Sequence, residues 1–110
     1  MFGEITIGEK TIEVKATGST PVYYNQVFHA DFFTESQGMG EDNAGLTIDV
    51  FMRLAFIMKK QAEGKDMSKV NEGQFMKWLD EFEPMDLPNA MPQVVDFYMG
   101  NATGTAKPKK

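Results

Sequence analysis

The chain has 110 residues, of which 42% are hydrophobic and 25% charged, and its net charge is −5. These values are typical of one folded domain and argue against a disordered chain. There is no cysteine, which excludes disulfides and thiolate metal sites. Acids outnumber bases 16 to 11, so nucleic acid is not expected as the main partner, although residues 107–110 form a short basic run.

The same features indicate a cytoplasmic protein. A small secreted domain often needs disulfides, so their absence favours a reducing compartment. Residues 1–4 contain Glu4 where a signal peptide has basic residues, and no apolar segment follows. The longest apolar stretch, residues 46–58, contains two charged residues and is too short to span a bilayer. We therefore expect no membrane partner.

Alternating apolar residues predict a β-hairpin at the beginning of the chain. Ile5 and Ile7 share one face of a first strand, and Ile12 and Val14 share one face of a second. The turn spans residues 8–10. If its last two residues form the loop, Ile7 pairs with Ile12; if its first two do, Ile5 pairs with Ile12. Both registers stay open, and either hairpin must pack on helices to be stable.

A first helix is predicted after the hairpin. Thr20 is a good N-cap and Pro21 suits the first helical position. Some of the following apolar residues have helical spacing, so we expect a helix from about Pro21 to Phe33. Residues 37–45 contain three glycines and two acids and predict a loop.

The second helix is expected to begin near Thr47 and to lie at the centre of the fold. Its apolar residues leave little polar face before Lys59, which is typical of a helix packed on more than one side. Asp49 and Arg53 are four residues apart and can pair on its exposed edge. The Gly-Lys-Asp segment at residues 64–66 should end it.

Two shorter helices complete the prediction. Asn71 and Gln74 resemble a capping box, and an apolar stripe follows them at helical spacing: Phe75, Trp78, Leu79 and Phe82. A connector, residues 83–89, contains two prolines. The last helix should run from about Pro88 or Asn89 to Tyr98 or Met99, with its stripe at Met91, Val94, Val95 and Tyr98.

The sequence therefore predicts an α+β fold that is mostly helical. An N-terminal β-hairpin packs on about four α-helices in a single domain, residues 1–100. Residues 101–110 are polar and end in lysines, which predicts a flexible, disordered C-terminal tail.

Few residues could carry catalysis. His29 is the single histidine, and Asp31 could orient it as a base, but a surface histidine near a charge is the more common arrangement. Glu81 and Glu83 lie near Trp78, where a carboxyl pKa could be raised, yet they face away from the apolar stripe. We expect no enzyme.

No metal or cofactor site is expected either. Glu41, Asp42, Asn43 and Asp49 form an acidic segment, but their spacing does not fit a calcium loop and no glutamate closes it. There is no phosphate loop, zinc motif or dinucleotide fingerprint.

Nine methionines are the unusual feature of the composition. Six lie within or beside predicted helices: Met52, Met58, Met76, Met85, Met91 and Met99. Methionine most often fills gaps in a core, but methionine-rich surfaces also adapt to several partners. Met85 and Met99 are at helix margins and are the better candidates for a binding surface.

Several segments in order resemble one family. They are the hairpin 5–16; Thr20-Pro21 with Tyr24, Phe28 and Asp31; Ala-Phe-Ile-Met-Lys-Lys-Gln-Ala at 55–62; Trp-Leu-Asp-Glu-Phe-Glu at 78–83; Pro-Gln-Val-Val-Asp-Phe-Tyr at 92–98; and the lysine-ended tail. Together they resemble the short tail assembly chaperones of long-tailed bacteriophages and prophages of Gram-positive bacteria. The chain departs from this pattern at His29, where the family often has glycine, and in its glycine-rich loop.

The resemblance implies a protein made in the bacterial host cytoplasm during infection and absent from the mature virion. It would bind the tape measure protein and keep its apolar helices soluble. It would also help recruit tail tube subunits, often through a longer form made by ribosomal frameshifting. Self-association stays open.

Holding amphipathic helices requires exposed apolar surface, with methionine and aromatic side chains as anchors. Phe97 and Met99 fall off the core stripe of the last helix, so we expect Met85, Met91, Phe97 and Met99 to line the partner-binding surface. The alternative function is a structural tail-completion or head-tail connector subunit of the virion, whose hairpin edges would add strands to neighbouring subunits.

Overall fold

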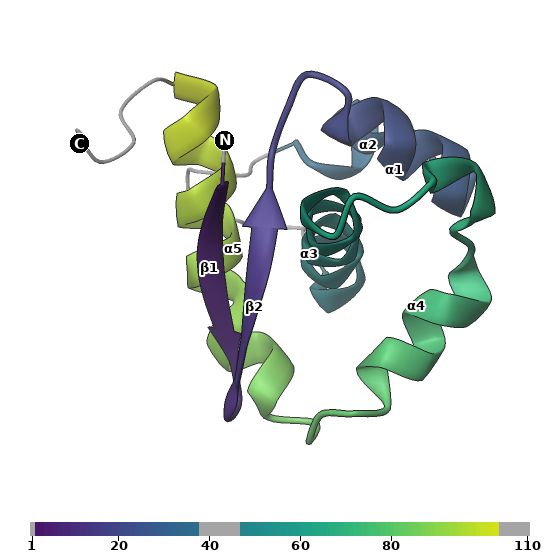
Figure 1. Ribbon diagram of the computed structural model, residues 1–110. Helices are drawn as coiled ribbons and strands as arrows, with labels where there is room; N and C mark the ends of the chain where they lie inside the picture. The colour runs from purple at the N-terminus through teal and green to yellow at the C-terminus, as the bar shows by residue number, and fades with distance from the viewer. Residues whose placement is uncertain (1, 38–46, 104–110) are drawn as a thin grey trace.

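The computed structural model describes residues 2–37 and 47–103. The elements follow one another as β1 (Phe2–Ile7), β2 (Lys10–Lys15), α1 (Thr20–Phe28), α2 (Phe32–Glu35), α3 (Ile48–Ala62), the 3₁₀ turn η1 (Met67–Lys69), α4 (Glu72–Leu79) and α5 (Asp86–Thr103). Figure 1 shows the hairpin lying in front of α5 and beside α3, with α1 and α4 on the other side of α3. The predicted α+β fold, an N-terminal hairpin packed on helices, is confirmed.

Helix α3 is the centre of the molecule, as predicted. From Val50 to Met58, every residue except Arg53 is buried. The helix contacts β2, α1 and α5, so three elements remove its side chains from water. Gly64, at φ +73°, follows the last turn, where the left-handed backbone that ends helices favours glycine.

The hairpin register is now decided. Ile5 pairs with Ile12 and Ile7 pairs with Lys10, so the loop consists of Gly8 and Glu9. Gly8 has φ +63°, and a glycine at the first loop position is what a type II′ turn requires. Ile5, Ile7 and Val14 are buried against the helices.

Helix α5 covers the outer edge of β1. The backbone N–H of Thr6 donates to Gln93 Oε1, and Gln93 Nε2 donates to the Thr6 carbonyl, each at 2.9 Å. One glutamine side chain thus makes both hydrogen bonds that a third strand would make there. Four residues further along α5, the Phe97 ring lies against Gly3, where an added Cβ would be 2.4 Å from the ring.

The predicted first helix begins within one residue of the predicted position but ends earlier, at Phe28 instead of Phe33, and its N-cap was assigned wrongly. Helix α1 ends at Phe28, and His29 is its C-cap, with φ 53° in the left-handed region. Histidine tolerates this conformation better than most residues. A separate short helix, α2, then begins at Phe32 after Asp31, whose side chain accepts from the Phe33 N–H.

Thr20 is the first residue of α1, not its N-cap, which is Ser19. The buried Thr20 hydroxyl accepts from the Thr17 N–H at 2.9 Å and donates to Gln61 Oε1 at 2.6 Å. Gln61 Nε2 in turn donates to the Thr17 hydroxyl. The threonine therefore ties the beginning of α1 to the end of α3 in place of capping a helix.

The later helices differ from prediction mainly in length. Asn71 accepts from the Gln74 N–H at 3.0 Å, which confirms it as a cap. Helix α4 ends at Leu79, before Phe82, although the Phe82 ring still packs on Trp78 at 5.3 Å between centroids. Helix α5 begins earlier than predicted, at Asp86, and extends to Thr103, three residues into the predicted tail; residues 104–110 of that tail and residues 38–45 of the predicted loop lie outside the described residues.

We predict that Gly3→Ala destabilises the fold by about 1–3 kcal/mol, because the new methyl group must displace the Phe97 ring. Gly18→Ala is the matched control, since nothing lies within 4 Å of an added Cβ there. Urea denaturation followed by circular dichroism measures both. Equal midpoints for the two variants would show that Phe97 does not pack tightly on β1.

Candidate binding surfaces

The four residues predicted to bind a partner lie in different environments. Met85 is 66% exposed, in the connector before α5. Met91, Phe97 and Met99 are all on α5, half-buried, and pack against the core. At 100° per residue, Phe97 and Met99 point to nearly opposite sides of the helix. The structure does not gather the four side chains on one face, and their role in binding stays a prediction.

Other large apolar side chains are also exposed, and one of them, Phe33, is more exposed than any of the four predicted residues. Besides Met85, the exposed ones in the described part of the chain are Phe2, Val22, Phe33, Ile48 and Met76. Phe33 is the most open at 71%, and Phe2 is 66% exposed. Sequence reasoning missed Phe33 because it was assigned to the continuous first helix, where its apolar neighbours suggested a core position.

Phe33 and Ile48 are adjacent in the chain to residues that line a hollow between α2 and the beginning of α3. The hollow, of about 340 Å³, is lined by Thr34, Glu35, Thr47, Asp49, Val50 and Arg53. Its lining is mixed, since Val50 is apolar and the other five lining residues are polar or charged. Such a border of apolar and polar groups is typical of surfaces that contact proteins.

Two lining residues of this hollow, Glu35 and Arg53, belong to a polar cluster with Tyr24. The Tyr24 hydroxyl donates to Glu35 Oε1 at 2.6 Å. Arg53 Nη1 lies 3.7 Å from the same oxygen, and the guanidinium lies over the Phe28 ring at 5.3 Å. Arg53 therefore pairs with Glu35 instead of the predicted Asp49, because the short helix α2 brings Glu35 over it.

The buried Tyr24 hydroxyl is a donor and not a base. Burial, followed by its hydrogen bond to Glu35, raises the pKa of Tyr24 well above its usual value. The hydroxyl consequently stays protonated in the folded protein and links α1 to α2. Arg53 Nε is buried without a hydrogen-bond partner in the described residues, so the guanidinium is positioned by its ion pair with Glu35 and its contact with the Phe28 ring.

Of the residues considered for catalysis, Asp31 and Glu81 make structural hydrogen bonds, and His29 and Glu83 are exposed. Asp31 accepts from the Phe33 N–H and from the Thr34 hydroxyl, at 2.7 Å for the latter, while His29 is exposed at the end of α1. Glu81 accepts from Lys10 Nζ at 2.7 Å, and that bond lowers the pKa of its carboxyl. Glu83 is exposed.

Within residues 2–37 and 47–103, no group of three or more His, Cys, Asp or Glu side chains could hold a metal ion. Asp49 lies in the first turn of α3, and the other members of the predicted acidic segment, Glu41, Asp42 and Asn43, lie outside those ranges. In the same part of the chain, no helix is both long and apolar enough to cross a membrane.

Comparison with protein-family models, curated proteins and solved structures finds no match to this chain.

Ionisation of Tyr24 predicts an alkaline loss of stability. Its folded-state pKa is raised, and an unfolded tyrosine ionises near pH 10. The contribution of protonated Tyr24 to the free energy of unfolding is therefore complete below about pH 10. Above that pH it falls by at most about 1.4 kcal/mol per pH unit. Urea denaturation from pH 9 upward should show this slope, and Tyr24→Phe should flatten it. Burial also raises the pKa of Tyr98, so a smaller slope remains.

Tyr23→Phe is the matched control, because the Tyr23 hydroxyl makes no hydrogen bond in the described part of the chain. Tyr24→Phe should also cost about 1 kcal/mol at neutral pH, since Glu35 loses a donor. An unchanged alkaline slope in Tyr24→Phe would contradict the assignment.

Proposed function

We propose that this chain is a phage tail assembly chaperone that binds the tape measure protein and helps recruit tail tube subunits during tail morphogenesis. The proposal begins from the ordered resemblance of the hairpin, the second helix, residues 78–83 and the last helix to that family. It places the protein in the cytoplasm of the bacterial host and outside the mature virion. The longer frameshifted form would contact the tail tube protein.

One structural observation supports the proposal most directly. Phe2, Phe33 and Met85 are each at least 66% exposed. Aromatic and methionine anchors on separate elements are suited to holding the apolar stripe of an amphipathic helix.

A specific observation also supports the alternative, a structural tail-completion or head-tail connector subunit. The sheet has two strands in the order β1–β2, and the side chain of Gln93 hydrogen-bonds to the outer edge of β1. Among the described residues no strand pairs with the outer edge of β2, so a neighbouring subunit could add a strand there. Mass spectrometry of purified particles separates the two functions, because the chaperone should be absent from them.

Co-expression with the tape measure protein encoded downstream tests the chaperone directly. We expect the two proteins to co-elute in size-exclusion chromatography, and the tape measure protein to be insoluble when expressed alone. If it is insoluble in both cases and this chain elutes alone, the connector subunit becomes the leading function.

Replacing exposed anchors should weaken that complex without unfolding the protein. Phe33→Ser and Met85→Ser, alone and together, remove side chains that are largely in water, so the urea midpoint should change little. Each anchor that binds should lower recovery of soluble complex by about fivefold or more. Gln26→Ser and Lys77→Ser, at exposed polar positions, are the matched controls. Full recovery with the double anchor variant would exclude these two side chains from the binding surface.

A further inference from the structure

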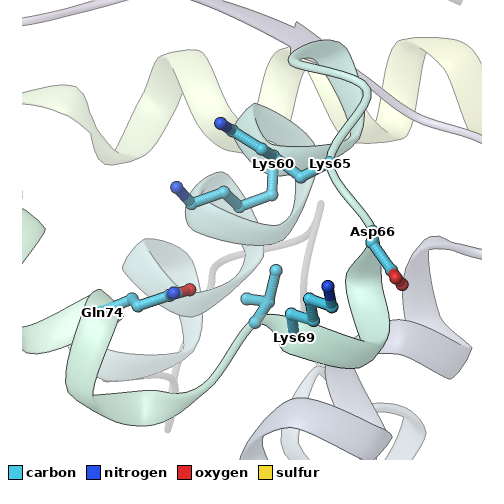
Figure 2. Close-up of a pocket in the computed structure, with 6 residues that line it drawn as sticks. Lys60, Lys65, Asp66, Lys69 and Gln74 are labelled. Atoms are coloured by element: carbon cyan, nitrogen blue, oxygen red, sulfur yellow. The ribbon is translucent and has the colours of Figure 1, made fainter.

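A small hollow at the end of α3 collects lysines from separate segments. Its volume is about 180 Å³, and it is lined by Lys60, Lys65, Asp66, Lys69, Val70 and Gln74. Lys60 is in the last turn of α3, Lys65 follows that helix, and Lys69 ends η1. Figure 2 shows the side chains of Lys60 and Lys65 reaching toward the same side, above Gln74 at the beginning of α4.

The chain neutralises this positive charge only in part. The lining holds three lysines and one acid, Asp66, a net charge of about +2. Within the described ranges, Lys65 and Lys69 form no ion pair. Lys60 lies 3.4 Å from Glu63, but that carboxylate also pairs with Lys59.

The carboxylate of Asp66 accepts hydrogen bonds within the turn that it begins. Its Oδ1 accepts from the backbone N–H of Ser68 at 3.0 Å and from the Ser68 hydroxyl at 2.7 Å. These bonds fix η1 and hold Lys69 beside the hollow. The result is a local positive site on a chain whose total charge is −5, and such a contrast selects an anionic partner.

The size of the hollow argues for a docked protein segment. Sites that enclose small molecules usually measure about 300–1,000 Å³, more than this hollow holds. Nucleic acid needs a longer basic track, and single strands also need aromatic platforms; the lining has neither aromatic side chains nor arginine. Val70, which follows Lys69 and is half-buried, offers an apolar contact in the same lining.

We propose that this lysine hollow binds an acidic segment of a partner protein, in which carboxylates flank a small apolar side chain. The carboxylates would contact Lys65 and Lys69, and the apolar side chain would lie against Val70. This inference does not depend on the proposed chaperone function, because the hollow is formed by other residues than the exposed apolar anchors.

A fluorescein-labelled peptide of sequence Gly-Glu-Val-Glu-Glu-Val-Glu-Gly is the probe, and the same peptide with glutamine for glutamate is its control. In fluorescence anisotropy with the full chain, the acidic peptide should bind, and its affinity should fall as salt rises from about 50 to about 300 mM. The glutamine peptide should not bind. Equal binding of both peptides, or binding of neither, would overturn the proposal.

Charge reversal locates the site. Lys65→Glu and Lys69→Glu should each weaken peptide binding by about threefold to tenfold. Lys77→Glu changes the net charge equally, at an exposed position of α4 outside the lining, and should leave the affinity within about twofold. An equal loss in Lys77→Glu would mean attraction by overall charge alone. A single-stranded oligonucleotide that binds more tightly than the peptide would overturn the choice of a protein partner.

Discussion

The burial of α3 on nearly all sides is the constraint on which the rest of the structure depends. A helix without a polar stripe cannot lie on a surface, so other elements must surround it. β2, α1 and α5 do so directly. On the remaining side, Phe56 meets the rings of Phe75 and Trp78 at 5.4 and 5.6 Å between centroids, which attaches α4. The arrangement of the other helices follows from covering this one.

The hairpin depends on that arrangement in turn. Two strands alone are marginally stable in water, and these are held by α3 beneath β2 and by α5 along β1. Gln93 replaces the hydrogen bonds of a missing strand, and the close approach of Phe97 explains why position 3 is glycine. Each strand of the hairpin thus has its own helix, α5 for β1 and α3 for β2.

Local patterns in the sequence predicted most elements because their apolar spacing and cap residues act locally. The central helix, the Asn71 cap and the hairpin were found in this way. The break at His29 was not, because apolar residues continue through it and only the left-handed backbone reveals the turn. The partners of Arg53 and Thr20 were also missed: Glu35 and Gln61 lie 18 and 41 residues away, and no local pattern encodes such contacts.

The candidate binding residues show the same limit more strongly. Whether a side chain is exposed depends on the tertiary packing, so the sequence does not distinguish the exposed Phe33 from the core phenylalanines. Phe97 was predicted to bind a partner because it falls off the core stripe, but its ring packs against Gly3 of β1. The lysine hollow combines residues of α3, η1, α4 and the short segments that join them, and no local sequence pattern marks these residues as a group. Helix α3 is 15 residues long, or about 22 Å, and separates Ile48 at its beginning from the lysines at its end. A partner that contacts both ends must therefore be extended or carry two binding segments, one apolar and one acidic.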